Sequence, residues 1–335
     1  MKKICLVIPY FGKWPDWFGF YLKSCEFNPT INWLIYTDCK TPKNPPKNVR
    51  FISANIEDFN KLASDKLKLK INIKNAYKLC DFKPACGIIF EDYLKSYDFW
   101  GHSDIDVVYG NIRRFITGKI LSSYDVITSM KKRTAGHFTL YKNTKKINEI
   151  FKKEQKYKLI FTSEANYVFD EEKRIKLRII CKKPPKYRTL EVKGMRGLVE
   201  ELADKKYLKV YSNEVIAQGR NPFKKFRIIF DKGRLFEEGD DKEFLYFHMH
   251  RLKNSIFCEE GKEIPDVFYI TNKEIFYNKK IGATKKIIRI IKILKATLIT
   301  KLDFILKFWG TYLWGKHPQL YYELKKKLKY KNGKD

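Results

Sequence analysis

The feature of this chain that most constrains its fold is the alternation of short apolar runs with stretches of helical periodicity. Residues 3–9 are almost continuously apolar and end at Pro9, which is typical of a strand buried on both faces of a sheet. Similar patterns predict strands at 32–36, 49–53, 98–103, 124–129 and 137–141, and helices at 16–25, 56–66, 70–80, 86–95, 111–117 and 143–153. This order predicts an α/β fold with a mainly parallel sheet flanked by helices.

Three of the predicted strands end in polar or irregular residues, at 9–11, at Asp38 and at 104–106. Ligands of parallel sheets bind beyond the carboxyl ends of the strands, so we expect these three segments to meet at one edge. Asp104 and Asp106 are two residues apart, which on an extended chain turns both carboxylates to one face. Oxygen ligands suit Mg²⁺ or Mn²⁺ and leave positions open for substrate phosphates. The Asp-x-Asp pattern also occurs in ordinary turns, so the choice between a metal site and a turn depends on the neighbouring residues.

The chain is strongly basic, with 69 Lys and Arg against 38 Asp and Glu and a formal net charge of +31. Such an excess favours nucleic acid, anionic lipid or phosphorylated substrates. A nucleic-acid-binding protein is one alternative, but the aromatic segments 9–21 and 97–109 carry few basic residues to interleave with stacking rings. A Mg²⁺-dependent phosphatase is another, and it is disfavoured because the first strand offers no carboxylate nucleophile. We therefore expect no nucleic-acid partner.

The seven cysteines include no C-x-x-C pair, which argues against a zinc site and suits a reducing compartment. The apolar run after Met1-Lys2-Lys3 is too short for a signal peptide, and no stretch is long enough for a spanning helix. The sequence thus favours a cytoplasmic protein.

From about 155 to 245 the periodicity weakens, and this region is predicted to form loops and helices on the acceptor side of a binding site.

Residues 284–309 have the pattern of a long amphipathic helix, with a basic residue every third position from Lys286 to Lys295. Trp309, Tyr312 and Trp314 follow it, and residues 285–335 carry 14 basic and three acidic residues. A basic stripe, a wide apolar face and terminal aromatics are typical of a helix that lies in a membrane interface. We expect 284–314 to contact an anionic membrane, although a helix packed on the domain or a dimerisation helix would have a similar sequence.

Five segments in this order resemble those of a family of bacterial GT-A glycosyltransferases found with capsule and O-antigen assembly. The segments are 8–12 (IPYFG), 36–38 (YTD), 80–87 (CDFKPACG), 97–106 (YDFWGHSDID) and 136–140 (GHFTL). The layout is similar, more distantly, to glycogenin-like and Och1-like retaining glycosyltransferases. The resemblance implies a Rossmann-like GT-A domain over 1–282, with a donor half at 1–142 and an acceptor half at 143–282. The basic amphipathic tail at 283–335 lies outside it.

For the donor half, the resemblance implies contacts with a nucleotide-sugar, with UDP-galactose as the expected donor. Pro9, Tyr10 and Phe11 would line the nucleobase pocket, and Asp38 would bind the base or the ribose. Lys83, oriented by Asp81, would reach the donor phosphate or sugar. Asp104 and Asp106 would hold Mn²⁺ or Mg²⁺ on the diphosphate, with one of them also contacting the ribose. Each of these residues also has an ordinary structural explanation: loop packing, a turn aspartate or a solvated helix start.

The later residues would complete the site. His248 is the better candidate for a third metal ligand and His250 the alternate, while Lys253 or Arg251 would add positive charge at the leaving phosphates. Either of the acidic residues Asp170 and Glu171 would take the acceptor proton in an inverting reaction, or stabilise the cationic sugar in a retaining one. An exposed acidic turn is the alternative explanation for this pair. His137 would contact the donor sugar, or serve as a core histidine. The resemblance thus implies a hexosyltransferase acting on a lipid-linked saccharide, peripheral on the inner face of the cytoplasmic membrane.

Overall fold

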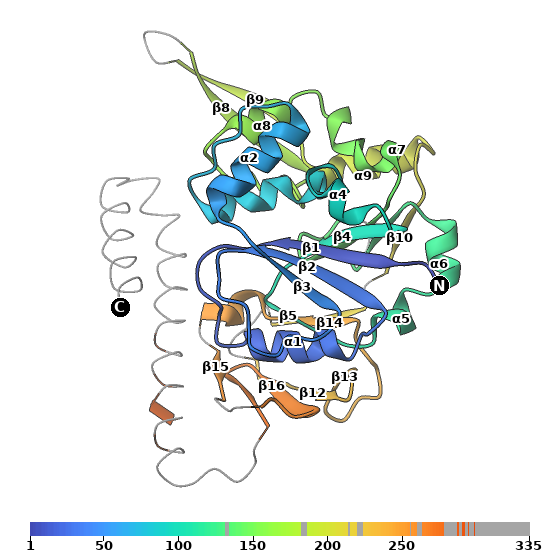
Figure 1. Ribbon diagram of the computed structural model, residues 1–335, viewed down its shortest axis with the longest axis vertical. Coiled ribbons are helices and arrows are strands. Elements are labelled where there is room, and N and C mark those ends of the chain that lie inside the picture. The colour runs from blue at the N-terminus through green and yellow to red at the C-terminus, as the bar shows by residue number, and fades with distance from the viewer. Residues whose placement is uncertain are drawn as a thin grey trace.

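The computed structural model describes residues 1–130, 134–181, 186–213, 215–219, 224–254, 256–259 and 263–277, together with five helical residues between 287 and 298. Figure 1 shows a central sheet with helices above it and further helices and strands below it. A two-stranded hairpin projects at one end.

The central sheet has seven strands in the order β10-β6-β7-β4-β1-β2-β3. β1 pairs in parallel with both β2 and β4, β2 with β3, and β10 with β6, while β7 is antiparallel to both of its neighbours. The sheet confirms the predicted α/β class with mainly parallel strands. The strands are β1 (Ile4–Pro9), β2 (Ile31–Thr37), β3 (Val49–Ser53), β4 (Phe99–Ser103), β6 (Val126–Thr128), β7 (Phe138–Lys142) and β10 (Val210–Ser212).

Helices cover both faces of this sheet, as the alternating pattern predicts. In Figure 1, α2, α4, α7, α8 and α9 lie on one side of the sheet, and α1 lies on the other. The helical elements are α1 (Phe18–Glu26), α2 (Ile56–Leu67), η1 (Ala76–Ala85), α3 (Cys86–Ile89), α4 (Glu91–Leu94), α5 (Ile112–Phe115), α6 (Gly118–Ser123), α7 (Lys145–Asn148), η2 (Ile150–Lys153), α8 (Tyr157–Thr162), α9 (Met195–Asp204) and η3 (His250–Asn254).

The two faces of β1 feed separate cores, which explains why its sequence is apolar without alternation. Cys5 and Val7 pack in the core that contains Phe59 of α2. Leu6, on the opposite face, packs in the core that contains Phe18 of α1. A strand buried on both faces has no polar side, so the run 3–9 marks the centre of the sheet.

The weakly patterned region contains far more strand than the sequence predicts. β5 (Val107–Tyr109), β11 (Ile216–Gln218) and β14 (Tyr246–His248) form a small sheet, and β8 (Arg174–Cys181) pairs with β9 (Lys186–Lys193) as the projecting hairpin. A five-stranded sheet contains β12 (Arg227–Asp231), β13 (Arg234–Glu237), β15 (Phe257–Cys258), β16 (Val267–Thr271) and β17 (Glu274–Phe276). The prediction of loops and helices over 155–245 therefore misses the strands β8 to β13, although α8 and α9 are helices within this region.

Several predicted boundaries also need correction. The helix predicted at 70–80 is instead η1, a 3₁₀ segment that begins at Ala76 behind the side-chain cap of Asn75. The helix predicted over 143–153 is split into α7 and η2. Asp104 and Asp106 lie in the turn between β4 and β5 rather than on a strand.

Only part of the predicted tail helix lies within the described residues. The residues described there are helical, and their apolar side chains are 50–63% exposed: Ile287, Ile290, Ile291, Leu294 and Leu298. The rest of 283–335, including its basic stripe, lies outside the described residues. Within the part of the chain that the structure describes, no helix is long and apolar enough to cross a bilayer.

Candidate functional site: a carboxylate and histidine cluster in a deep cavity

The carboxyl ends of β1, β2 and β4 lie at one edge of the sheet, as predicted, because the three strands run parallel. A cavity of about 1040 Å³ opens at this edge. Its lining includes residues from four separate segments, at 7–11, 103–106, 134–137 and 170–172, and basic residues between 248 and 253. Two of the three strand ends that the sequence singled out, 9–11 and 104–106, are thus brought to one place by the parallel topology.

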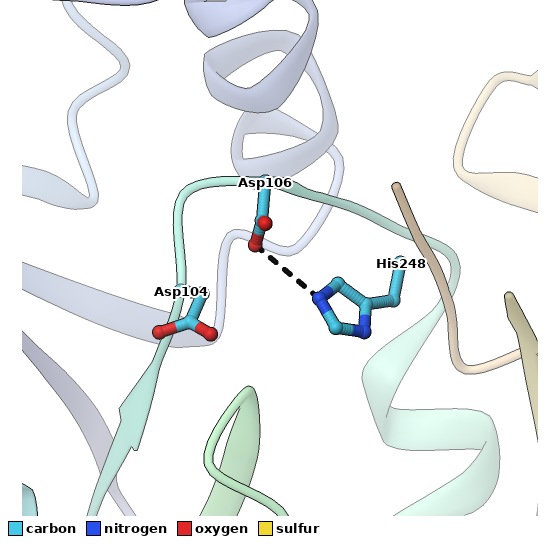
Figure 2. A group of neighbouring side chains, drawn as sticks. All are labelled: Asp104, Asp106 and His248. Atoms are coloured by element: carbon cyan, nitrogen blue, oxygen red, sulfur yellow. Dashed lines mark ion pairs between the residues drawn. The ribbon is translucent and has the colours of Figure 1, made fainter. Parts of the chain in front are cut away.

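At the base of this cavity, Asp104, Asp106 and His248 form a cluster whose candidate ligand atoms all lie within 4.8 Å of one another. Figure 2 shows the two aspartates on one turn, with the His248 ring facing Asp106 from a neighbouring strand. The His248 Nε2 and Asp106 Oδ1 atoms are 3.5 Å apart, which is long for a hydrogen bond. The Asp106 Oδ1 and His248 Nδ1 atoms are buried and have no hydrogen-bond partner among the described residues.

The donor set fits a divalent cation. Two carboxylates and an imidazole suit Mn²⁺, and the oxygens also suit Mg²⁺. Buried polar atoms without partners are rare, because each one loses its interaction with water, so the orphaned Asp106 Oδ1 calls for a ligand. The His248 nitrogen that faces this oxygen is Nε2, and the orphaned nitrogen of the same ring is Nδ1. The arrangement supports the prediction of a metal site, although no particular ion is specified by it.

The position of His248 follows from strand pairing. β14 runs antiparallel to β5, and this register places His248 opposite Val107, the residue after Asp106. The backbone N–H of Met249 donates to the Asp106 carbonyl at 2.9 Å. These bonds fix the histidine beside the aspartate although the two are far apart in sequence.

Two lysines neutralise the two aspartates. The Lys83 ammonium donates to Asp104 Oδ1 at 2.6 Å, and the Lys253 ammonium donates to Asp106 Oδ2 at 3.0 Å. Burial would raise the pKa of Asp106, but His248 and Lys253 outweigh it and hold that pKa below its usual range. Burial likewise opposes the charge on Lys83, yet Asp104 raises the Lys83 pKa well above its usual value. Both lysines are therefore charged, and both line the cavity.

Lys83 also connects the cluster to the acidic pair. Its ammonium lies 3.1 Å from Asp170 Oδ2 and donates to the Gly136 carbonyl at 2.9 Å. Asp170 is buried and Glu171 is exposed, and both line the cavity. Burial raises the pKa of Asp170 to about 7, although Lys83 opposes this shift. Asp170 Oδ1 is buried and has no hydrogen-bond partner among the described residues.

Gly136 is required where the acidic pair approaches the backbone. A Cβ atom at this position would lie 2.5 Å from Asp170 Oδ2 and 2.9 Å from Glu171 Oε2. The Gly136 N–H donates to Glu171 Oε2 at 3.2 Å. The resemblance over 136–140 therefore has a structural reason: both carboxylates pack on this glycine.

Asp81 does not orient Lys83, which corrects the sequence-based expectation. It is fully buried and does not line the cavity; its carboxylate binds the Lys78 ammonium at 2.7 Å and accepts from the backbone N–H groups of Tyr167 and Phe169. Since Asp170 follows Phe169 directly, Asp81 holds in place the segment that carries the acidic pair.

The loop after β1 lines the cavity with all three of its predicted residues: Pro9, Tyr10 and Phe11. Tyr10 stacks on Trp14 with ring centroids 5.3 Å apart, and Phe11 packs edge-on against Tyr36. Asp38 is exposed and lies outside the cavity lining, where its carboxylate accepts from the Gly12 N–H at 2.8 Å. Asp38 therefore supports this loop, and its contact with a base or ribose stays a prediction.

Two further histidines that the sequence singled out, His137 and His250, differ in their surroundings. His137 is buried, and its Nδ1 lies 2.6 Å from the Tyr246 hydroxyl, yet it also lines the cavity beside His248. Both proposed roles of His137 remain compatible with this position. His250 also lines the cavity, and burial, together with the charge of its neighbours, lowers its pKa to about 4. It lies outside the three-residue cluster.

The lining residues that the sequence did not single out include Trp17, Tyr77, Arg196 and Gln218. The Trp17 indole N–H donates to the Ile105 carbonyl at 3.0 Å and so ties α1 to the aspartate turn. The aromatic character of the segment after β1 could have indicated Trp17. Tyr77, Arg196 and Gln218 belong to segments without a distinctive motif, so no sequence signal pointed to them.

Comparisons with known proteins place the chain in a family without assigning it an activity. No curated protein matches it. Two solved structures of the galactosyltransferase LgtC, one with donor and acceptor sugar analogues and one of an active-site mutant, are 11% identical over 64% of this chain. The matched regions cover 76% and 75% of the two LgtC chains, and the TM-scores are only 0.33 and 0.34. A family model matches residues 6–279, and the chain therefore belongs to the family of unknown function DUF6625.

Proposed function

We propose that this protein is a metal-dependent glycosyltransferase with a GT-A domain that transfers a hexose from a nucleotide-sugar to a saccharide. The observation that carries the proposal is the Asp104, Asp106 and His248 cluster, which lies in a cavity large enough for a nucleotide-sugar. A UDP-sugar is the proposed donor, with UDP-galactose as the specific candidate, and Mn²⁺ or Mg²⁺ as the ion.

Breaking the bond between the sugar and the diphosphate leaves extra negative charge on the leaving oxygens. A divalent cation at the cluster would supply positive charge to the diphosphate. Lys253 and Arg251 line the same cavity, and their fixed positive charges would stabilise the leaving group as its charge develops. Pro9, Tyr10 and Phe11 would receive the nucleobase at the edge of the sheet.

Asp170 is the proposed residue at the reacting carbon or the acceptor hydroxyl. As a base, it would take the proton from the acceptor hydroxyl while that oxygen bonds to the sugar carbon. On the opposite face of the sugar, it would instead stabilise the positive charge of a retaining reaction. Its orphaned Oδ1 and its pKa of about 7 suit proton acceptance near neutral pH. The anomeric configuration of the product distinguishes the two roles.

The direct test is the release of nucleotide from UDP-galactose and other UDP-sugars in Mn²⁺. Asp104→Ala and Asp106→Ala should each lower turnover at least about a hundredfold, because each removes a ligand and its charge. Asp65→Ala, which changes an exposed aspartate on α2, is the matched control. Wild-type turnover in either cluster variant would refute the metal role.

Thermal shift provides an independent test of the ligand class. UDP with Mn²⁺ should raise the melting temperature, because a ligand that binds only the folded protein stabilises it. A single-stranded oligonucleotide should not. The reverse result would favour a nucleic-acid-binding protein.

We further propose that the acceptor is a lipid-linked saccharide of surface polysaccharide synthesis, and that the protein works on the inner face of the cytoplasmic membrane. The support is the basic tail sequence together with five exposed apolar side chains at helical spacing: Ile287, Ile290, Ile291, Leu294 and Leu298. Contact with an anionic membrane through 284–314 would bring the cavity to a membrane-bound acceptor.

Flotation with phosphatidylglycerol vesicles tests this proposal. The double substitution Ile291→Asp and Leu294→Asp should abolish flotation, because charge on the apolar face opposes insertion. Leu159→Asp alters an exposed leucine on α8 and is the matched control. Equal flotation of the double variant and the control would contradict membrane binding by this helix.

A further inference from the structure

The cavity has an aromatic residue at its mouth that the proposed chemistry does not use. Tyr77 lines the cavity, yet it is 64% exposed, which makes it one of the few exposed large aromatic residues of the described chain. Pockets that bind small molecules are lined mainly by hydrophobic and aromatic side chains, so an exposed aromatic ring in the cavity lining is a candidate contact for a ligand.

The backbone of Tyr77 is fixed although its ring is exposed. Its N–H donates to the Asn75 side chain at 2.9 Å, and its carbonyl accepts from the Asn166 side-chain amide. The next residue, Lys78, is fully buried and held by three hydrogen bonds. The backbone that carries the exposed ring is therefore held in place. Less conformational entropy of the protein is then lost when a ligand packs on the ring.

A hydrogen bond ties Tyr77 to the segment that carries the acidic pair. Asn166, its bonding partner, is four residues before Asp170 in the same segment. Partial burial raises the pKa of the Tyr77 phenol; Cys80, Asp170 and Glu171 add to this rise, and Lys253 opposes it. Asp170 and Glu171 line the same cavity as the ring.

We propose that Tyr77 is the stacking platform for the acceptor sugar, an inference that rests on the proposed glycosyltransferase function. One face of a pyranose ring carries C–H groups, and such a face packs well on an aromatic ring, while the hydroxyls at the sugar edge need polar partners. Asp170 Oδ1 and Glu171 supply acceptors for those hydroxyls, and Arg196 supplies donors. The acceptor would lie flat on Tyr77 with one hydroxyl directed at Asp170.

The test measures nucleotide release from UDP-galactose and Mn²⁺, with and without methyl glycosides of galactose, glucose, mannose and N-acetylglucosamine as acceptor probes. Tyr77→Ala should raise the half-saturating concentration of the stimulating glycoside about tenfold, since a well-packed aromatic contact is worth that order of affinity. Tyr77→Phe keeps the stacking face and should stay within about twofold of wild type. Leu159→Ala, which truncates an exposed apolar residue outside the cavity, is the matched control.

Each other outcome overturns the inference. If the half-saturating concentration of the glycoside in Tyr77→Ala is within about twofold of the wild-type value, Tyr77 is not a stacking platform for the acceptor. If the Ala and Phe variants lose equal affinity for the glycoside, the effect belongs to the Tyr77 hydroxyl and not to stacking on its ring. If Tyr77→Ala loses the UDP-induced thermal shift, the ring contacts the donor instead of the acceptor. If wild type releases nucleotide but no methyl glycoside stimulates it, the acceptor is not held at this position. Absence of any nucleotide release contradicts the proposed function itself.

Discussion

The buried ion pair between Lys78 and Asp81 offers the sharpest test of how the site is supported. The Lys78 ammonium donates to Asp81 Oδ2 at 2.7 Å and to the carbonyls of Ile160 and Ala165 at 2.6 and 2.5 Å. The two side chains are 1% and 0% exposed. The pair therefore ties η1 to the segment 160–170, which ends at the acidic residues of the cavity.

Lys78→Met removes the ammonium but keeps the apolar length of the side chain. It leaves a buried carboxylate without its counter-ion and two carbonyls without a donor. Breaking a buried pair in this way costs about 3–5 kcal/mol of unfolding free energy. In a chain of this size that corresponds to a fall in Tm on the order of 10 °C.

A double-mutant cycle with Asp81→Asn isolates the pair. The amide oxygen of the introduced asparagine can still accept from the backbone N–H groups of the 167–169 segment, but the side chain carries no charge. The double variant should therefore be destabilised by less than the sum of the single variants, with a coupling of about 1–3 kcal/mol. The measurement is thermal or urea unfolding of all four proteins.

The chain contains a matched control for this substitution. Asp92 and Lys95 form an ion pair with the same three-residue spacing, but their side chains are 55% and 75% exposed. Lys95→Met should cost less than about 1 kcal/mol, because exposed pairs are screened by water. If Lys78→Met is no more destabilising than Lys95→Met, the argument from burial is wrong.

Three further outcomes follow from the site geometry. Gly136→Ala should lower the free energy of unfolding by about 1–3 kcal/mol and nucleotide release at least about tenfold, since its Cβ would lie 2.5 Å from Asp170 Oδ2. Gly118→Ala is the control, because a Cβ there meets nothing within 4 Å. Equal activity of the two variants would contradict this view. The pKa of Asp170 is raised from 3.8 to about 7 by burial, so the folded protein keeps a proton that the unfolded chain releases, and this contribution to stability is lost as pH rises from about 4 to 7. Asp170→Asn in EDTA should therefore gain Tm relative to wild type across that range, and a pH-independent difference would refute the assignment. Dialysis against EDTA should abolish nucleotide release and Mn²⁺ should restore it, whereas full activity after dialysis would exclude the metal role of the cluster.

The sequence predicts the centre of the fold well, for a physical reason. Strands buried on both faces, such as 3–9, must be continuously apolar, and that signal is local. The parallel order of β1, β2 and β4 then follows from the helices between them, and it brings 9–11 and 104–106 to one edge. The resemblance points to His248, but the contact of His248 with Asp106 depends on the register of β14 on β5, which no local pattern encodes.

The errors arise where partners are distant in sequence. Lys78 has the sequence appearance of a solvated helix residue, but its acceptors are the carbonyls of Ile160 and Ala165, more than 80 positions away. Proximity in the chain suggests Lys83 as the partner of Asp81, whereas the actual partners of Asp81 include the backbone of Tyr167 and Phe169. Two of the strands after 155, β10 and β14, pair with β6 and β5 far back in the sequence, and runs of three residues are too short to show a period.

The two halves of the candidate site share Lys83, whose ammonium contacts both Asp104 and Asp170, but their other supports differ. The cation cluster depends on the turn after β4 and on the pairing of β14 with β5, while the acidic pair depends on the buried Lys78 and Asp81 strut. Lys78→Met, which breaks the ion pair with Asp81, should consequently lower turnover more than it lowers Mn²⁺ affinity. Electron paramagnetic resonance of bound Mn²⁺ in Lys78→Met measures the second quantity directly. If Mn²⁺ affinity falls as much as turnover does, the two halves form a single mechanical unit and the separation argued from their supports is incorrect.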